Sequence, residues 1–226
     1  MRILAVETST EYCSVALWQD GTVRERCELV GQKHSEVLMT MLDALLKDAG
    51  ITVKQVDGIA FGKGPGSFTG VRIACGVAQG LALGANLPVV GVCTLEAIAE
   101  TSGKDNVLAV LDARMGELYL AAYERRDEAW HAVIEPCLCK VETAPLLEGR
   151  WCGAGNGFTV LGSALQARYD GHLRADCLDS SLFPRAAAIA ILGAAQFAQG
   201  KGADAALALP LYLRDKVALK TSERTK

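Results

Sequence analysis

The sequence predicts an α/β protein of two lobes, each built on a mixed β-sheet, and the order of its elements supports this fold class. Three short strand patterns come first, and strand and helix patterns then alternate up to residue 103. After the polar segment 102–105, the same order begins again in a weaker form. Strands that alternate with helices form sheets with crossover helices. We therefore predict an N-terminal lobe over 1–103 and a reduced second lobe over 104–206.

The composition is that of a chain that folds around its own core. Half of its 226 residues are hydrophobic and 22% are charged, which excludes a disordered or collagen-like protein. The net charge of −3 lacks the basic excess with which proteins hold phosphate backbones unaided. Because only 6% of the residues are aromatic, a sheet that stacks single-stranded bases is also disfavoured. We therefore expect no nucleic-acid partner outside a complex.

The eight cysteines are expected to be free thiols in a reducing, cytoplasmic compartment. A strand pattern begins at Ile3, with no signal-peptide pattern ahead of it. The closest pair, Cys137-x-Cys139, has neither the redox CxxC spacing nor the spacing of a zinc knuckle. The most apolar stretch, 186–197, is shorter than the ~18–20 residues that span a bilayer. The sequence therefore predicts no membrane segment.

The elements of the first lobe are predicted from their apolar runs and from the residues at their ends. Strand patterns lie at 3–8, 13–18, 23–29, 58–62 and 89–92. Asp20-Gly21 favours a tight hairpin between the second and third strands. Ser35 is the expected N-cap of a helix at 35–49, which Gly50 ends. Thr69 should open a helix at 70–85, and a shorter helix should follow at 94–101.

The second lobe has weaker patterns of the same kinds. Strands are expected at 107–111, 118–123 and 130–138. Helices are expected at 158–168 and 184–199, the latter with Pro184 in its first turn.

Two loops of the first lobe could hold an anion. Glu7-Thr8-Ser9-Thr10 follows the first strand, and a carboxylate followed by hydroxyls at a turn can hold a metal and a terminal phosphate. The glycine-rich segment 62–72, with Gly64, Gly66 and Ser67, could offer backbone N–H groups to a phosphate. The glycine-rich segment matches none of the named nucleotide motifs. Turn chemistry alone also accounts for both, so a phosphate site and a structural role both remain open.

The helices at 35–49 and 70–85 carry more apolar surface than one sheet covers. On the second helix, Gly76, Gly80 and Gly84 fall on one ridge. A helix that is apolar nearly all round is covered on both sides. This additional apolar surface is either buried where the two helices pack on each other or covered by another protein. We predict a protein interface formed by Val37, Leu38, Met41, Leu42, Leu45, Ile73, Gly76, Val77, Gly80, Leu81 and Gly84.

The remaining polar residues indicate no catalytic centre. His34, His131 and His172 share no metal-ligand spacing, so we expect neither catalytic residues nor a bound metal. His34 is expected to start its helix. The segment from Asp112 to Glu117 is typical of a hairpin connection, with a local Arg114–Glu117 pair.

Four segments together resemble the bacterial TsaB family, also called YeaZ. They are ILAVETSTEYCSVAL at 3–17, GKGPGSFTGVRIACGVAQGLALG at 62–84, LDARMGELY at 111–119 and LPLYLRDKVA at 209–218. The resemblance implies an actin/Hsp70-like (ASKHA) fold of two ribonuclease-H-like lobes, in which the last segment, 207–226, packs back on the first lobe. It also implies a role in the tRNA modification that makes threonylcarbamoyladenosine beside the anticodon.

The resemblance further implies a non-catalytic partner protein. Such a chain binds and supports a TsaD-like threonylcarbamoyltransferase through its first two helices, is joined by a TsaE-like ATPase, and forms a homodimer when alone. It meets tRNA only through that complex, and ATP or ADP only in the multi-subunit assembly. TsaD-like chains carry a paired-histidine metal motif, whereas this chain has only His34-Ser35-Glu36 at that point. This departure argues against catalysis.

Glu7 stands where the family more often has aspartate. We therefore expect Glu7, Thr8, Gly64, Gly66 and Ser67 to be remnants of a phosphate site with a mainly structural role. The alternative is an actin-like ATP-binding enzyme that acts alone, as a small-molecule kinase or a transferase, or a metalloprotease by the old peptidase label of the superfamily. The basic residues Arg214, Lys216, Lys220, Arg224 and Lys226 either contact RNA within a complex or form a solvated tail.

Overall fold

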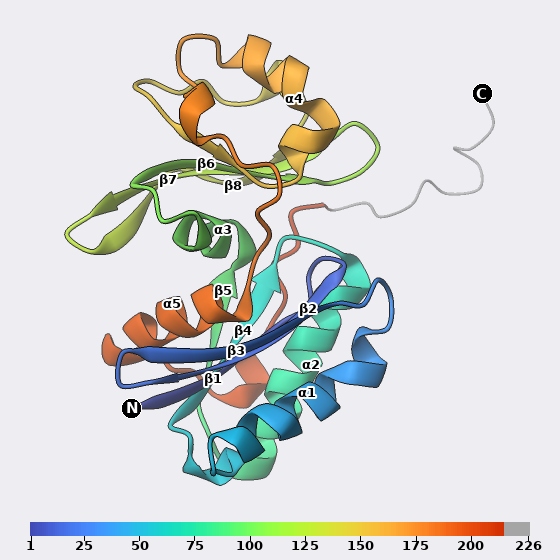
Figure 1. Cartoon of the computed structure of the whole chain (residues 1–226), viewed down its shortest axis with the longest axis vertical. Coiled ribbons are helices and arrows are strands. Elements are labelled where there is room, and N and C mark those ends of the chain that lie inside the picture. The colour runs from blue at the N-terminus through green and yellow to red at the C-terminus, as the bar shows by residue number, and fades with distance from the viewer. Residues whose placement is uncertain (215–226) are drawn as a thin grey trace.

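The computed structural model describes residues 1–214, which form two β-sheets, one above the other in Figure 1. Every strand and helix that the sequence predicts is present, with ends that move by at most three residues. The first sheet and its helices are β1 (Arg2–Glu7), β2 (Tyr12–Gln19), β3 (Thr22–Leu29), α1 (His34–Asp48), β4 (Gly58–Gly64), α2 (Phe68–Ala85), β5 (Val89–Cys93) and α3 (Thr94–Ser102). Then follow β6 (Asn106–Asp112), β7 (Leu118–Arg126), β8 (Ala129–Cys139), β9 (Cys152–Ala154), α4 (Gly157–Arg168) and α5 (Ala186–Ala198).

The first sheet has the order β3-β2-β1-β4-β5 and is buried on both faces. Strand β1 pairs antiparallel with β2 and parallel with β4. Its side chains alternate between two cores, because Leu4 and Val6 face α1 and α2 while Ile3 and Ala5 face α5. A strand with two buried faces needs apolar residues at every position. This explains the unbroken apolar run at the start of the sequence.

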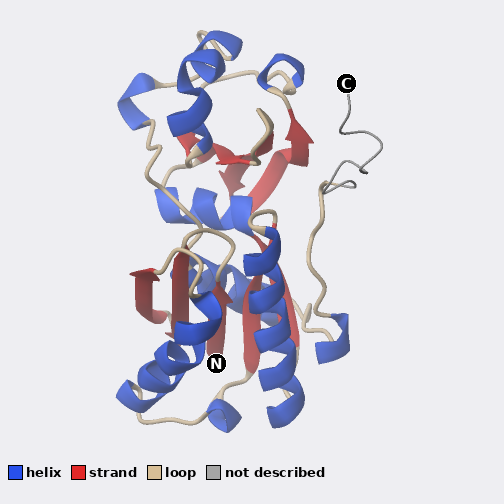
Figure 2. Cartoon of the chain, turned by 90° about the vertical axis from the view of Figure 1, so that its right-hand side faces the viewer, coloured by secondary structure: helices blue, strands red, loops and turns tan. Residues whose placement is uncertain are grey.

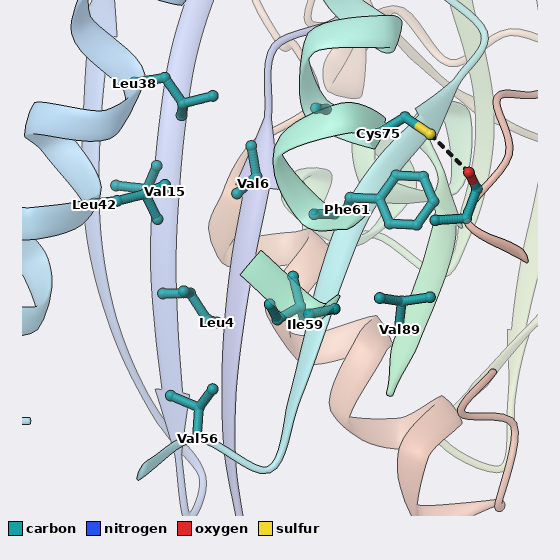
Figure 3. Close-up of a cluster of buried hydrophobic side chains, with 14 of the residues drawn as sticks. Leu4, Val6, Val15, Leu38, Leu42, Val56, Ile59, Phe61, Cys75 and Val89 are labelled. Atoms are coloured by element: carbon teal, nitrogen blue, oxygen red, sulfur yellow. Dashed lines mark hydrogen bonds between the residues drawn. The ribbon is translucent and has the colours of Figure 1, made fainter. Parts of the chain in front are cut away.

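Helices α1 and α2 lie side by side on one face of this sheet (Figures 1 and 2). Figure 3 shows Leu38 and Leu42 of α1 packed toward Val15 on β2, in the same cluster as Phe61 on β4. Burial of this kind stabilises the fold by about 25 cal/mol per Å² of apolar surface. This face of the first sheet therefore has a core of its own before any partner is added.

The second sheet repeats the first in reduced form, with the order β8-β7-β6-β9. Strands β6, β7 and β8 form an antiparallel meander, and β9 pairs parallel with β6 as β4 does with β1. A 3-10 turn, Val141–Thr143, follows β8 where α1 follows β3. Two isolated parallel bridges, Trp151 to Leu173 and Ala154 to Asp179, stand where β5 stands in the first lobe. The sequence analysis missed β9, because three residues are too few to show a period.

The last helix of each half packs on the sheet of the other half. Helix α3 places Leu95 and Ile98 against the second sheet, whereas α5 places Ile189 against the first. The first sheet also caps α5, because the backbone N–H of Ala186 donates to Ser14 Oγ at 2.9 Å. The prediction that 184–199 belongs to the lobe over 104–206 was therefore wrong. Apolar periodicity shows that a helix is buried, but it does not show which sheet buries it.

Residues 205–214, which we call the strap, run back along the first lobe and then to the second. The carbonyl oxygen of Ala208 accepts hydrogen bonds from Cys75 Sγ at 2.8 Å, dashed in Figure 3, and from Gln79 Nε2 at 3.0 Å. Leu211 N donates to the carbonyl of Lys63 on β4 at 2.7 Å. The strap therefore joins the edge of α2 to the end of the first sheet. The remainder of the predicted segment 207–226, with Lys216, Lys220, Arg224 and Lys226, lies outside the described residues.

Three predicted helix starts were wrong by one or two residues. Helix α1 begins at His34, as expected for that residue, but Lys33 rather than Ser35 stands at the N-cap position. The buried His34 ring lies with Nε2 3.2 Å from the carbonyl oxygen of Tyr12. Ser67, not Thr69, caps α2 and accepts from Gly70 N. Pro184 precedes α5 instead of entering its first turn. Gly50, with a φ of +66°, does follow α1 as predicted.

The prediction of eight free thiols was also wrong, because Cys152 at the start of β9 and Cys177 form a disulfide. These cysteines are 25 residues apart. Sequence spacing alone does not show that two such cysteines lie close enough to form a disulfide. Helix α2 is the helix within 1–214 that has the length and apolar composition to cross a bilayer, and a third of it is buried. Helix α5 is apolar but shorter, as the prediction for 186–197 stated.

Candidate functional site

A cleft of about 810 Å³ lies between the two lobes. It brings together the three loops that the sequence analysis singled out, although they are far apart in the chain. Ser9 and Ser67 line it from the first lobe, and Arg114 and Asn156 line it from the second. The strap closes one side with Leu211 to Arg214. The loops of the first lobe meet because β1 and β4 are parallel neighbours, whose carboxyl ends share one edge of the sheet.

The two predicted anion loops are fastened to each other by their own polar groups. Ser67 N donates to the carbonyl oxygen of Ser9 at 2.7 Å, and Thr8 Oγ1 donates to the carbonyl of Gly70 at 2.7 Å. A Cβ on Gly70 would lie 1.9 Å from the Thr8 carbonyl oxygen. The glycine is therefore needed for this close backbone approach. At these contacts, the Ser67 N–H and the Thr8 hydroxyl, which could otherwise donate to a phosphate, are hydrogen-bonded within the protein.

Gly64 and Gly66 allow two other close contacts of the glycine-rich loop. Gly64 has a φ of +101°, which favours glycine, and packs against Val71. A Cβ on Gly66 would lie 2.6 Å from the carbonyl oxygen of Ser9. Gly66 thus allows the loop to fold closely over the turn after β1, whereas Gly64 leaves room for the carbonyl oxygen of Leu211 on the strap.

Glu7 is buried beneath these loops and lies outside the cleft lining. Its Oε1 accepts a hydrogen bond from Ser9 N, whereas its Oε2 has no hydrogen-bond partner among the described residues. Burial raises the pKa of this carboxyl to about 7, because a charged group loses its hydration in the interior. Gly62 makes room for it, since a Cβ there would lie 1.6 Å from Oε2. Glu7 therefore lies in the core of the loop pair rather than at the surface of the cleft.

The hairpin between β6 and β7 is present as predicted, but its ion pairs differ. Arg114 pairs with Asp112 at 3.1 Å, and Glu117 pairs with Arg214 of the strap at 2.8 Å. Arg214 also donates to the carbonyl of Ala113 at 2.9 Å. The predicted Arg114–Glu117 pair was wrong, because the turn points Arg114 into solvent with a φ of +63°. Arg214 thereby ties the strap to the second lobe.

The solvent face of α2 is the main exposed apolar feature of the first lobe. Gly76, Gly80 and Gly84 are not buried, and a Cβ at each would meet no atom within 4 Å. Leu83 beside them is 80% exposed. Ile73, Val77 and Leu81 are half-buried at the flank of the core. Nothing within residues 1–214 covers this face.

Four residues of the predicted interface belong to the core instead. Leu38, Met41, Leu42 and Leu45 are buried against the first sheet. Most of the broad apolar surface of α1 is thus buried within its own lobe. Val37 is exposed in part and lies only about 20° around the helix from Asp48, which pairs with Arg26 of β3. Val37 therefore faces the β3 side rather than α2.

The sequence analysis missed several exposed residues of α1 and α2 that lie outside the predicted interface. Met39 of α1 is 50% exposed, and Phe68 at the start of α2 is 41% exposed. Phe68 stacks with Arg72, which points toward Tyr212 of the strap. Exposed aromatic, methionine and arginine side chains are enriched at protein interfaces, and this composition could have identified them. Within 1–214, no group of three or more His, Cys, Asp or Glu side chains is placed to hold a metal.

Comparisons with known proteins identify the family. A family model described as TsaD, tRNA N6-adenosine threonylcarbamoyltransferase, matches residues 26–221. The tRNA threonylcarbamoyladenosine biosynthesis protein TsaB of Escherichia coli (strain K12) is 42% identical, with 97% of each chain covered. YeaZ from Pseudomonas aeruginosa is 38% identical, with 94% of this chain and 99% of that chain covered and a TM-score of 0.85.

A second solved protein from Pseudomonas aeruginosa, described as similar to the peptidase YeaZ, is 37% identical with a TM-score of 0.86 over the same shares. These matches and the two mixed sheets confirm the predicted α/β, ASKHA-like fold class. They extend over nearly the whole chain rather than over one motif. The chain therefore belongs to the TsaB, or YeaZ, family of tRNA threonylcarbamoyladenosine biosynthesis proteins.

Proposed function

We propose that this chain is a non-catalytic subunit that binds and supports a TsaD-type threonylcarbamoyltransferase. The observation that carries the proposal is the uncovered face of α2, on which three open glycines lie in one ridge. Small residues let the backbone of another helix come close, so this face fits a helix of a partner. The loops that resemble a phosphate site are fastened to each other instead, which supports a structural role for them.

The rest of the proposed assembly follows from the family. A TsaE-type ATPase joins the complex, the chain forms a homodimer when no partner is present, and tRNA is met only through the complex. The chain needs no cofactor of its own, and ATP or ADP binds only in the assembled complex. The proposed compartment is the cytoplasm.

Gly80→Leu should weaken the proposed contact. The new side chain projects from the middle of the ridge and holds the partner helix away, so we expect the dissociation constant for the same organism's TsaD-type protein to rise at least ~10-fold. Light scattering after size exclusion and titration calorimetry measure this. Leucine is also a better helix former than glycine, so the variant's Tm should not fall.

Gly162→Leu on α4 is the matched control. Gly162 is also a helical glycine, and a Cβ there would meet no atom within 4 Å, but it lies in the second lobe. The binding of this variant should match that of the unmodified chain. Equal binding by the Gly80→Leu variant would refute the docking face, and no binding by the unmodified chain would refute the proposed function.

The cleft supports a second candidate, an ATP-binding enzyme that acts alone. Its volume of about 810 Å³ falls within the range of small-molecule sites. Calorimetric titration of the purified chain with ATP and Mg²⁺ tests it. Heat of binding that Ser67→Ala removes would favour the enzyme over the subunit.

A further inference from the structure

Arg72 is the only charged residue on α2. It stands four residues before Gly76, so Arg72, Gly76, Gly80 and Gly84 continue one ridge at steps of four residues. A helix laid along the glycines would therefore meet the guanidinium at one end of its path. The ridge thus combines an apolar surface with a single positive charge.

The guanidinium is held in a fixed orientation by two aromatic residues. Its Nε donates to the Tyr212 hydroxyl at 2.7 Å, and its Cζ lies 3.7 Å from the centre of the Phe68 ring. The Tyr212 ring centre is 5.6 Å away on the strap. An arginine held by stacking and by a hydrogen bond at Nε loses less conformational freedom when it binds a ligand.

The N–H groups on the two Nη atoms have no protein acceptor within residues 1–214. No Asp or Glu of that part of the chain lies within 4 Å of the guanidinium nitrogens. In the free chain, water satisfies these groups, because Arg72 is exposed. Once the ridge is covered, that water is lost. A buried charge without a partner is costly, so whatever covers the ridge must supply an acceptor.

We propose that Arg72 is the specificity-determining anchor of the docking face, and that the partner is a different protein whose docking helix presents an Asp or Glu carboxylate to both Nη atoms. The inference rests on the proposed function. A carboxylate matches the planar fork of arginine with two parallel hydrogen bonds. A second copy of this chain is a poorer occupant, because its α2 carries no acidic residue, and two of the three acidic residues of its α1, Asp43 and Asp48, are already paired with Lys47 and Arg26.

The test measures binding of Arg72→Ala, Arg72→Lys and Tyr212→Phe to the same organism's TsaD-type protein by calorimetry. We expect the dissociation constant to rise roughly 10- to 100-fold for Arg72→Ala and nearly as much for Arg72→Lys, because lysine lacks the fork. Tyr212→Phe removes only the hydrogen bond that orients the guanidinium, so a smaller rise, about 3- to 10-fold, is expected. Self-association should change less than about twofold.

Arg126→Ala is the control for the loss of one positive charge, because Arg126 forms an exposed pair with Glu124 on β7 of the second lobe. Its binding should equal that of the unmodified chain. Arg72→Glu combined with an Asp or Glu→Arg change on the partner's docking helix should restore binding, and the pair that does so identifies the carboxylate.

The outcomes separate this inference from the proposed function. If Arg72→Ala binds normally while Gly80→Leu does not, the anchor is overturned and the docking face stands. If Arg72→Ala weakens self-association as much as partner binding, the selective anchor is overturned. If the unmodified chain binds no TsaD-type protein, both the proposed function and the anchor fail.

Discussion

Replacing Gly70 with alanine should destabilise the protein by about 3–5 kcal/mol. The added Cβ would lie 1.9 Å from the carbonyl oxygen of Thr8, a backbone atom that cannot rotate away. Relief requires the two loops to separate, which breaks the Thr8–Gly70 and Ser9–Ser67 hydrogen bonds. Overpacking costs about 1–3 kcal/mol, and an unsatisfied buried polar group costs a similar amount. Urea denaturation monitored by circular dichroism measures the loss.

Gly76→Ala provides the comparison on the same helix. Gly76 is exposed, and a Cβ there would meet no atom within 4 Å. Alanine should therefore stabilise α2 by about 0.5–1 kcal/mol through its helix propensity. If the two alanine variants had equal denaturation midpoints, the close contact between the loops would be wrong.

Glu7→Gln should change how stability depends on pH. The folded-state pKa of Glu7 is raised to about 7 from an ordinary 4.5, so between these values the folded protein holds a proton that the unfolded chain releases. Stability is then lost as pH rises from about 4.5 to 7 and stays low above that. Each unit of difference in pKa corresponds to about 1.36 kcal/mol. The Gln variant should therefore be more stable than the parent by about 3 kcal/mol at pH 8.

The same comparison near pH 4.5 should show only a small difference, because Glu7 is then protonated in the folded protein and about half protonated in the unfolded chain. The amide oxygen of glutamine keeps an acceptor for Ser9 N, so the hydrogen bond at this position is conserved. Urea denaturation of both proteins between pH 4.5 and 8 gives the difference. A constant difference across that range would show that Glu7 is ionised in the folded protein.

The sequence was sufficient to predict the helices and strands longer than three residues, but not which elements pack together. Val6 and Phe61 sit in apolar runs that predict buried strands, and parallel pairing of those strands explains why the loops after them meet. In contrast, the apolar arc that includes Leu38 and Leu42 fits burial by the sheet as well as burial by another protein. Composition measures the apolar surface of a helix, whereas only the fold shows how much of it remains uncovered.

The candidate site was predictable where it depends on local sequence. The spacing of Gly76, Gly80 and Gly84 fixes one ridge on any straight α-helix. The anchoring of Arg72 was not predictable, because Tyr212 is 140 residues away in the chain. Glu117 and Arg214 are likewise distant in sequence and meet only when the strap reaches the second lobe.

The crossing of α3 and α5 means that the two lobes are not separable folding units. The segment 1–103 alone would leave the face of the first sheet around Ile3 and Ala5 without α5, and the segment 104–214 alone would leave its own sheet without α3. Each half would expose the apolar face that the other half covers. Helices α3 and α5 also contact each other, so the two lobes are joined by packed helices as well as by the chain segments between them.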